Sequence, residues 1–234
     1  GSMNLVQGMF LNSSYEPLSK AEVRQALCYA VNRDEINQFM FGGKSRIIGT
    51  HMIPNMSVYY EPETEKVYSY DPQKAKQLLA DAGYPDGFDV DMTVSDLDME
   101  GILLTDLAQK VKDDLYQIGI NVNIKTEAWA AGYGDEYRNG TLGFTVMYWD
   151  VQLEFLPGGV VGQRAGWTAE KDPELAAMYQ EAMEATDDTA RADVLGKIQD
   201  AMYEDGPFIV IAQAPAHIAH STRLAGVDIF DSYT

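Results

Sequence analysis

The chain has 234 residues and carries 17 Lys and Arg against 36 Asp and Glu, a formal net charge of −19. No basic stripe is present that could neutralise phosphates, so this charge argues against nucleic acid and anionic membrane surfaces as partners. Hydrophobic residues make up 46% of the chain, which is enough to form a core. No apolar run reaches the ~18 residues that span a bilayer.

The start of the chain contains a segment that we expect to lie outside the fold. Residues 1–3 read Gly-Ser-Met, which is typical of the remnant of a cleaved tag, so a single domain is expected within residues 4–234. Residues 9–11 are expected to form a short strand.

The first helical pattern begins after Ser19, which with Glu22 three residues later matches a capping box. Apolar residues then repeat at helical spacing to Val31, and the helix continues or restarts toward Phe41 before two glycines end it. Cys28 is the only cysteine and lies within this pattern, so we expect it to pack as a small hydrophobic side chain.

The middle of the chain predicts a β-α-β unit after a long, packed loop over residues 44–70. An Asp-Pro pair begins a helix over residues 71–83, and residues 90–94 alternate between apolar and polar side chains as a half-exposed strand does. The longest amphipathic helix is expected over residues 104–118, followed by a second alternating strand over 120–124. These two strands should be parallel, with a right-handed crossover.

The last part of the chain continues the alternation of helices and strands. A short helix near residues 130–138 precedes residues 144–149, which are apolar on both faces and predict a central buried strand. Helical patterns over 175–183 and 194–202 and a buried strand over 208–211 follow. The predicted class is α/β, with a mixed, mainly parallel sheet flanked by helices.

Signatures of enzymes are absent from the sequence. It contains no GxSxG, GxxxxGK[ST], HExxH or CxxC motif, and the setting of Cys28 argues for an inert thiol. His51, His217 and His220 do not form a spacing typical of a metal site. We therefore expect no catalytic residue, no metal site and no cofactor.

The carboxyl ends of the predicted strands are the best candidate for a binding site, because open α/β sheets bind ligands there. Trp129 follows one strand and Trp149 and Asp150 end another, with Gln152 and Glu154 just beyond. A flat indole beside directed hydrogen-bonding groups suits a small-molecule cleft. The alternative is that Trp149 belongs to the core and that its polar neighbours only cover the edge of the sheet.

Four segments in register, one of them running from Leu115 to Gly119-Ile120, resemble the family 5 solute-binding proteins of ABC importers, which carry oligopeptides, dipeptides, nickel chelates and some sugars or opines. The other three are Pro17-Leu18 followed by residues 23–36, residues 70–84, and Gly140-Thr141 leading into Trp149. The resemblance implies the fold of a periplasmic-binding-protein-like (type II) lobe. It further implies that residues 4–234 are the second lobe plus the returning C-terminal segment of a two-lobe protein, without its N-terminal lobe.

The resemblance also implies a function without catalysis. The protein would bind a peptide or another small polar solute between two lobes and deliver it to the permease of an ABC transporter. It would lie outside the cytoplasm, in the periplasm or as a cell-surface lipoprotein. Trp149 would be a stacking wall facing an open crevice, with Asp150, Gln152 and Glu154 as hydrogen-bonding groups. In peptide-binding members an Asp three residues after this Trp pairs with the α-ammonium of the ligand, whereas this chain has the neutral Gln152.

Two other classes of function remain open from the sequence. A hydrolase or metal-dependent enzyme would use Asp96, Asp150 or Glu154 as cleft carboxylates. A sensor or adhesion module would instead bind protein through an exposed apolar patch. The tyrosine-rich loop with Tyr59, Tyr60, Tyr68 and Tyr70 is where such a patch is expected.

Overall fold

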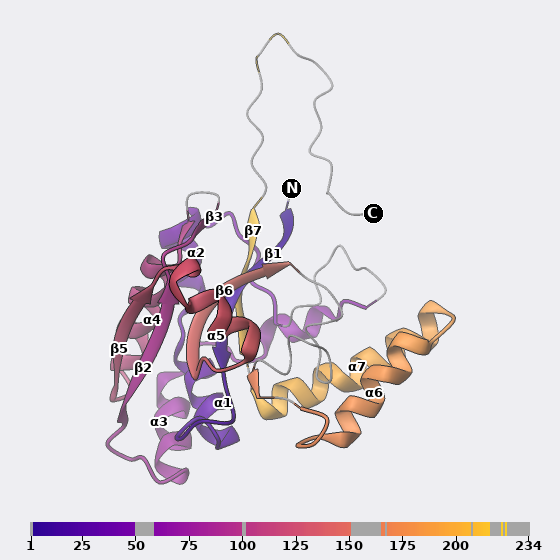
Figure 1. The fold of residues 1–234 in the computed structure, drawn as a ribbon, viewed down its shortest axis with the longest axis horizontal. Helices are drawn as coiled ribbons and strands as arrows, with labels where there is room; N and C mark the ends of the chain where they lie inside the picture. Colours follow the sequence, from indigo (N-terminus) through magenta and orange to yellow (C-terminus); the bar gives the residue numbers. More distant parts are fainter. Residues whose placement is uncertain are drawn as a thin grey trace.

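A three-stranded sheet with β1 in the middle lies at the centre of the computed structural model (Figure 1). Strand β1 (Ser2–Leu11) is antiparallel to both of its neighbours, β6 (Phe144–Asp150) and β7 (Phe208–Pro215). The strand begins at Ser2, so it includes two of the three residues assigned to a tag remnant. The structure describes residues 2–49, 59–99, 102–150, 165–166, 168–206, 208–215, 221 and 223.

The predicted β-α-β unit is confirmed. Strands β2 (Phe88–Ser95) and β5 (Ile120–Glu127) are parallel and in register over their whole length, and helix α4 (Leu104–Tyr116) connects them through the short hairpin β3–β4 (Asp98–Met99 and Ile102–Leu103). Strand β2 lies beside β6, which brings this unit against the central sheet (Figure 1). The predicted α/β class is confirmed, but the mainly parallel sheet is not. Among the described strands only β2 and β5 pair in parallel, and the three-stranded sheet and the β3–β4 hairpin are antiparallel.

The other described helices cover the sheet or project from it. They are α1 (Ala21–Ala30), α2 (Arg33–Phe41), α3 (Pro72–Asp81), α5 (Tyr133–Asn139), α6 (Pro173–Glu184), α7 (Asp188–Asp205) and the 3₁₀ helices η2 (Pro62–Lys66) and η3 (Trp129–Ala131). Helices α6 and α7 pair as a hairpin that extends away from the sheet (Figure 1). None of the helices in the described ranges is long and apolar enough to cross a bilayer.

Most helices begin close to the residues that the sequence predicts. Helix α3 does so because the Asp71 carboxylate accepts a hydrogen bond from the Lys74 N–H (2.9 Å). The capping box proposed for Ser19 and Glu22 is wrong. Helix α1 begins one residue too late for it, with Lys20 at the N-cap, and the Ser19 hydroxyl donates to Glu16 instead (2.6 Å).

The prediction that the helix over residues 104–118 is the longest is also wrong. Helix α7 has 18 residues and α4 has 13. The apolar stripe of α7 is short, but the helix continues through polar residues from the Asp187 cap to Gly206, whose left-handed backbone ends it. The length of a helix is therefore set here by its caps rather than by its buried face.

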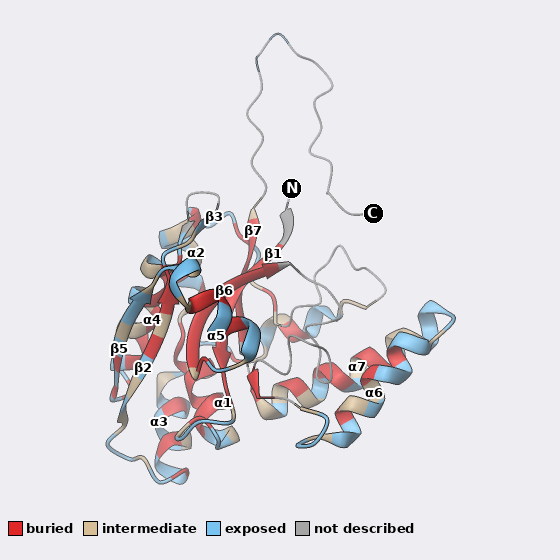
Figure 2. Ribbon diagram, viewed as in Figure 1, coloured by how far each residue is buried: buried red, intermediate tan, exposed pale blue. Residues whose placement is uncertain are grey.

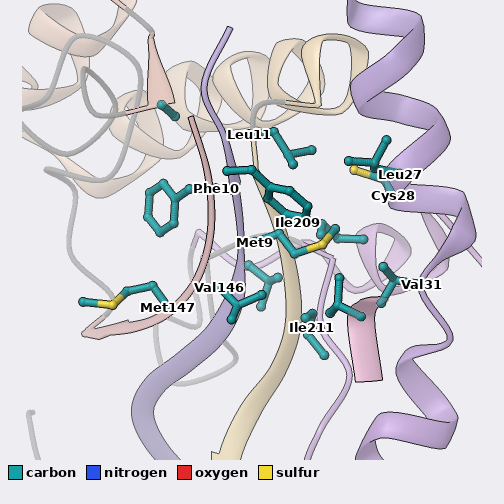
Figure 3. Close-up of a cluster of buried hydrophobic side chains, with 14 of the residues drawn as sticks. Met9, Phe10, Leu11, Leu27, Cys28, Val31, Val146, Met147, Ile209 and Ile211 are labelled. Atoms are coloured by element: carbon teal, nitrogen blue, oxygen red, sulfur yellow. The ribbon is translucent and has the colours of Figure 1, made fainter. Parts of the chain in front are cut away.

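The strands of the sheet form the core, while the helices expose their outer faces to solvent (Figure 2). Met9 packs with Cys28 and Ile209 on one face of the sheet, and Phe10 points to the opposite face with Met147 (Figure 3). The predicted packing of Cys28 is confirmed, since its side chain is fully buried.

The loop after α2 is fixed to the body of the lobe by a buried arginine. The Arg33 guanidinium donates to the carbonyl oxygens of Ile48 (3.0 Å), Val67 (2.7 Å) and Tyr68 (3.2 Å). Arg46 adds an isolated antiparallel bridge to β7. The described part of residues 44–70 is thus a packed connection, as predicted.

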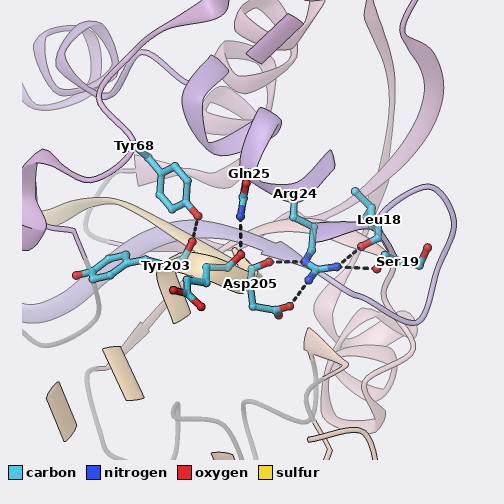
Figure 4. Close-up of polar contacts among 8 residues, drawn as sticks. Leu18, Ser19, Arg24, Gln25, Tyr68, Tyr203 and Asp205 are labelled. Atoms are coloured by element: carbon cyan, nitrogen blue, oxygen red, sulfur yellow. Dashed lines mark hydrogen bonds and ion pairs between the residues drawn. The ribbon is translucent and has the colours of Figure 1, made fainter. Parts of the chain in front are cut away.

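Side chains from α1 and the loop hold the C-terminal end of α7 (Figure 4). The Tyr68 hydroxyl donates to the carbonyl oxygen of Tyr203, and the Gln25 amide donates to that of Glu204. The Arg24 guanidinium donates to the carbonyl oxygen of Asp205. The guanidinium also pairs with the Asp205 carboxylate. A cation at a helix C-terminus interacts favourably with its unpaired carbonyl groups, so this contact anchors the projecting hairpin.

The thiol of Cys28 should be unreactive in the folded chain. Burial raises its pKa to about 12, and the nearby Arg33 and Arg24 charges offset only part of this effect. We expect no reaction with 5,5′-dithiobis(2-nitrobenzoic acid) at pH 8 in buffer and the release of one equivalent of product after unfolding in guanidinium chloride, followed by absorbance. Reaction of the folded chain at the rate of the unfolded chain would contradict the buried placement.

Candidate functional site

The carboxyl ends of β2, β5 and β6 form one edge of the lobe, which we call the carboxyl edge. Ser95 at the end of β2 pairs with Glu127 at the end of β5. Asp96 then accepts a hydrogen bond from the backbone N–H of Trp129 at 3.2 Å. The half-buried Trp129, predicted as a site residue, is therefore fixed to the end of β2, as its place after a parallel strand suggests.

Three further rings join the two predicted tryptophans into an aromatic cluster of five. Trp129 lies 5.8 Å from Tyr133 and 6.0 Å from Tyr137, between ring centroids. Phe10 lies 6.1 Å from Tyr137 and 4.8 Å from Trp149, both edge to face. Phe10, Tyr133 and Tyr137 were not among the predicted site residues. The spacing of four residues between the two tyrosines on α5 was an available signal, because it places both on one helix face.

Trp149 does not face an open crevice in this structure, and that expectation is corrected. Its side chain is only 4% exposed and lies across β1, where a Cβ atom at Gly8 would come within 2.8 Å of the indole Cη2. The absence of a side chain at Gly8 is what lets the indole settle onto the strand. The indole is a core group of the lobe, and its contact with a ligand stays a prediction.

The opposite face of the sheet carries polar groups at the same edge. Tyr148 pairs directly with Gln7 of β1, so their side chains share the face away from Trp149. Both are buried, at 7% and 1% exposure. Burial, and then the negative charge of the nearby Asp98, raise the pKa of the Tyr148 hydroxyl. The edge therefore combines an aromatic face with a face of neutral hydrogen-bonding groups.

The remaining predicted site residues are placed only in part. Asp150 ends β6 with its backbone paired to Leu5, while its side chain is not described. Gln152 and Glu154 lie outside the described residues. The grouping of these three side chains at the carboxyl edge stays a prediction.

The geometry gives little support to an enzyme. Asp96 uses its carboxylate to hold the Trp129 backbone, and the raised pKa keeps the Cys28 thiol protonated. Within the described ranges, no group of three or more His, Cys, Asp and Glu side chains could hold a metal ion. His51, His217 and His220 lie outside these ranges.

In the described part of the tyrosine-rich loop, residues 44–49 and 59–70, the four tyrosines do not form the exposed patch expected of a sensor or adhesion module. Tyr68 is buried and Tyr59 and Tyr60 are half-buried, and only Tyr70 of the four is exposed, at 44%. The Tyr59 hydroxyl donates to Asp188 (2.9 Å). These contacts bind the loop to the body of the lobe.

Comparison with solved structures defines the class of protein. AgaA from A. tumefaciens R10, solved in complex with agropinic acid, matches 91% of this chain with a TM-score of 0.79 and 26% identity. DppA from Helicobacter pylori, solved with the peptide STSA, matches 92% with a TM-score of 0.76 and 21% identity. The chain covers 44% and 43% of these two structures. It has the fold of one lobe of a type II periplasmic binding protein.

The family follows from the sequence comparisons. The profile of the bacterial extracellular solute-binding proteins, family 5 Middle, matches residues 2–157, and the chain belongs to this family. Heme-binding protein A of Haemophilus influenzae is 28% identical over 92% of this chain, and the dipeptide-binding protein of Escherichia coli is 25% identical over 91%. The chain spans 40% and 42% of their lengths. The family comprises extracellular binding proteins rather than enzymes, in agreement with the expected location.

Truncation of Trp149 should destabilise the lobe strongly. We expect Trp149→Ala to lower the free energy of unfolding by about 3–5 kcal/mol, because it leaves a cavity above β1 and removes the contact with Phe10. The matched control is Phe39→Ala, since Phe39 is 70% exposed and its loss should change stability by less than about 0.5 kcal/mol. Urea unfolding followed by circular dichroism measures both. Equal effects would mean that the indole is not a core group.

Proposed function

We propose that the chain is the C-terminal lobe of a two-lobe solute-binding protein that serves an ABC importer. It binds a peptide or another small polar solute between the lobes and catalyses no reaction. The observation that carries this proposal is the match of 91% of the chain to AgaA, of which it forms only 44%. An N-terminal lobe and a permease are the partners that this function requires.

Closure of the two lobes would couple binding to transport. A solute that contacts both lobes binds the closed form more tightly than the open form, so it shifts the population toward the closed form. The transporter would then recognise the closed arrangement. The carboxyl edge, with Trp129, Asp150, Gln152 and Glu154 on it and the buried Trp149 behind it, is the surface that this lobe would turn toward the solute.

The nature of residue 152 favours a solute without a free ammonium group at this position. A buried ammonium needs a carboxylate partner, because an unpaired buried charge is very costly. In peptide-binding members an Asp supplies that carboxylate, and Gln152 cannot. The relatives that match this chain include proteins named for heme and dipeptide binding and one solved with agropinic acid, so the fold accepts different solutes.

A thermal-shift screen of the two-lobe protein tests the function. The probes are trialanine, N-acetyl-trialanine amide, maltotriose and a nickel–histidine chelate. At least one probe should raise the melting temperature of the two-lobe protein. A ligand at a concentration of 100 times its Kd stabilises the folded state by about 2.7 kcal/mol. The present chain should show no shift with the same probe, because half of the pocket is missing. Turnover of a probe, with no stabilisation by any of them, would favour an enzyme.

Residue 152 offers a separate test of solute class. We expect Gln152→Asp in the two-lobe protein to strengthen trialanine binding at least tenfold and to leave N-acetyl-trialanine amide unchanged, because only the first carries an α-ammonium. Gln152→Asn is the neutral control and should favour neither probe. Isothermal titration calorimetry measures the affinities. No gain for trialanine with Gln152→Asp would remove residue 152 from the ammonium site.

A further inference from the structure

Gln7 is a buried polar side chain that forms no hydrogen bond within the described part of the chain. It is 1% exposed, and neither its amide nitrogen nor its amide oxygen is hydrogen-bonded to any group in the described part of the chain. Buried amides in folded proteins are nearly always paired, and each exception calls for a physical reason. An unpaired buried amide destabilises the fold that contains it, because it has lost its hydrogen bonds to water.

A second buried glutamine shows the usual arrangement. Gln199 of α7 is 0% exposed, and its amide nitrogen donates to the carbonyl oxygens of Tyr59 (3.2 Å) and Leu195 (3.4 Å). Its side chain therefore joins the loop to the helix. Gln7 makes no comparable contact within the described residues, although it has the same side chain and the same burial.

The position of Gln7 in the sheet relates it to the carboxyl edge. It lies on β1, with Tyr148 of β6 and Ala212 of β7 as its direct partners. The pair Leu5–Asp150, at the end of β6, is only two residues away along β1. Directly paired side chains share a face, so Gln7 and Tyr148 project from the same face of the sheet near this edge.

We infer that Gln7 is a recognition residue of the carboxyl edge, retained at a cost to the stability of the lobe because its amide binds a neutral polar group. This inference rests on the proposed solute-binding function. An amide both donates and accepts hydrogen bonds and carries no charge, so it is complementary to a hydroxyl or amide group. That group belongs either to the solute or to an ordered water molecule that joins the solute to Gln7.

The first part of the test compares the two buried glutamines in this chain. Gln7→Met keeps the length of the side chain and removes the unpaired amide, so the melting temperature should stay the same or rise by a few degrees. Gln199→Met removes an amide that is hydrogen-bonded and should lower it by several degrees. Differential scanning calorimetry measures both. If Gln7→Met lowered the melting temperature as much as Gln199→Met does, the inference would be overturned, because the Gln7 amide would then be paired within the lobe.

The second part uses the two-lobe protein and whichever of trialanine, N-acetyl-trialanine amide and maltotriose binds it. Gln7→Met should weaken the binding of that probe about five- to tenfold, which corresponds to the loss of one hydrogen bond. Gln199→Met should leave the affinity unchanged. Unchanged affinity with Gln7→Met would overturn the recognition role. If no probe binds the wild-type protein, the proposed function fails with it, whereas the stability comparison still decides whether the Gln7 amide is paired.

The two sources of the neutral group are separated by nuclear magnetic resonance. Cross-peaks from water to the Gln7 side-chain amide protons in the presence of the probe indicate an ordered water molecule. Cross-peaks from the probe itself indicate direct contact with the solute. Either result supports the inference, and the absence of both in the complex contradicts it.

Discussion

Hydrogen bonding of β1 on both of its edges is the constraint on which the rest of the lobe depends. Val6 of this N-terminal strand pairs with Trp149 on one side and with Gln213 on the other. The pairing with β7 contains an irregularity between Gln7 and Gly8, where a Cβ atom at Gly8 would come within 2.1 Å of the Ile209 carbonyl oxygen. Only glycine lacks that atom. The close approach of β7 and the burial of Trp149 therefore depend on the same residue.

Two arginines in one of the segments that carry the family resemblance stabilise the scaffold, and the groups to which they donate lie outside the carboxyl edge. Arg24 and Arg33 belong to the segment that matches the family, and both are buried and donate to backbone carbonyl oxygens. Arg24 anchors the end of α7, and Arg33 fixes the loop after α2. Such residues preserve a fold while the solute changes. This separation explains why the sequence indicates the family and leaves the solute undetermined.

The sequence predicted those elements whose signals are local. The Asp71 cap and the alternation of β5 needed no knowledge of distant residues, and both are as predicted. The sequence did not reveal the central place of β1, because Gln7 and Gly8 interrupt its apolar pattern. It placed Trp129 and Trp149 near one edge from strand order alone. The burial of Trp149 depends on tertiary contacts with Gly8 and Phe10, which no local pattern encodes.

Under the proposed function, neutral amides would give the carboxyl edge a mode of discrimination different from that of a carboxylate. A buried carboxylate selects a cation by charge and tolerates variation in the rest of the ligand, whereas an amide must meet a donor and an acceptor in fixed directions. Loss of either partner leaves a polar atom unpaired, so a solute that lacks the matching group is rejected. The negative charge of the chain does not alter this selection, since screening confines surface charges to short range. An edge built from Gln7, Tyr148 and Gln152 would therefore recognise the pattern of hydrogen-bonding groups on a solute rather than its charge.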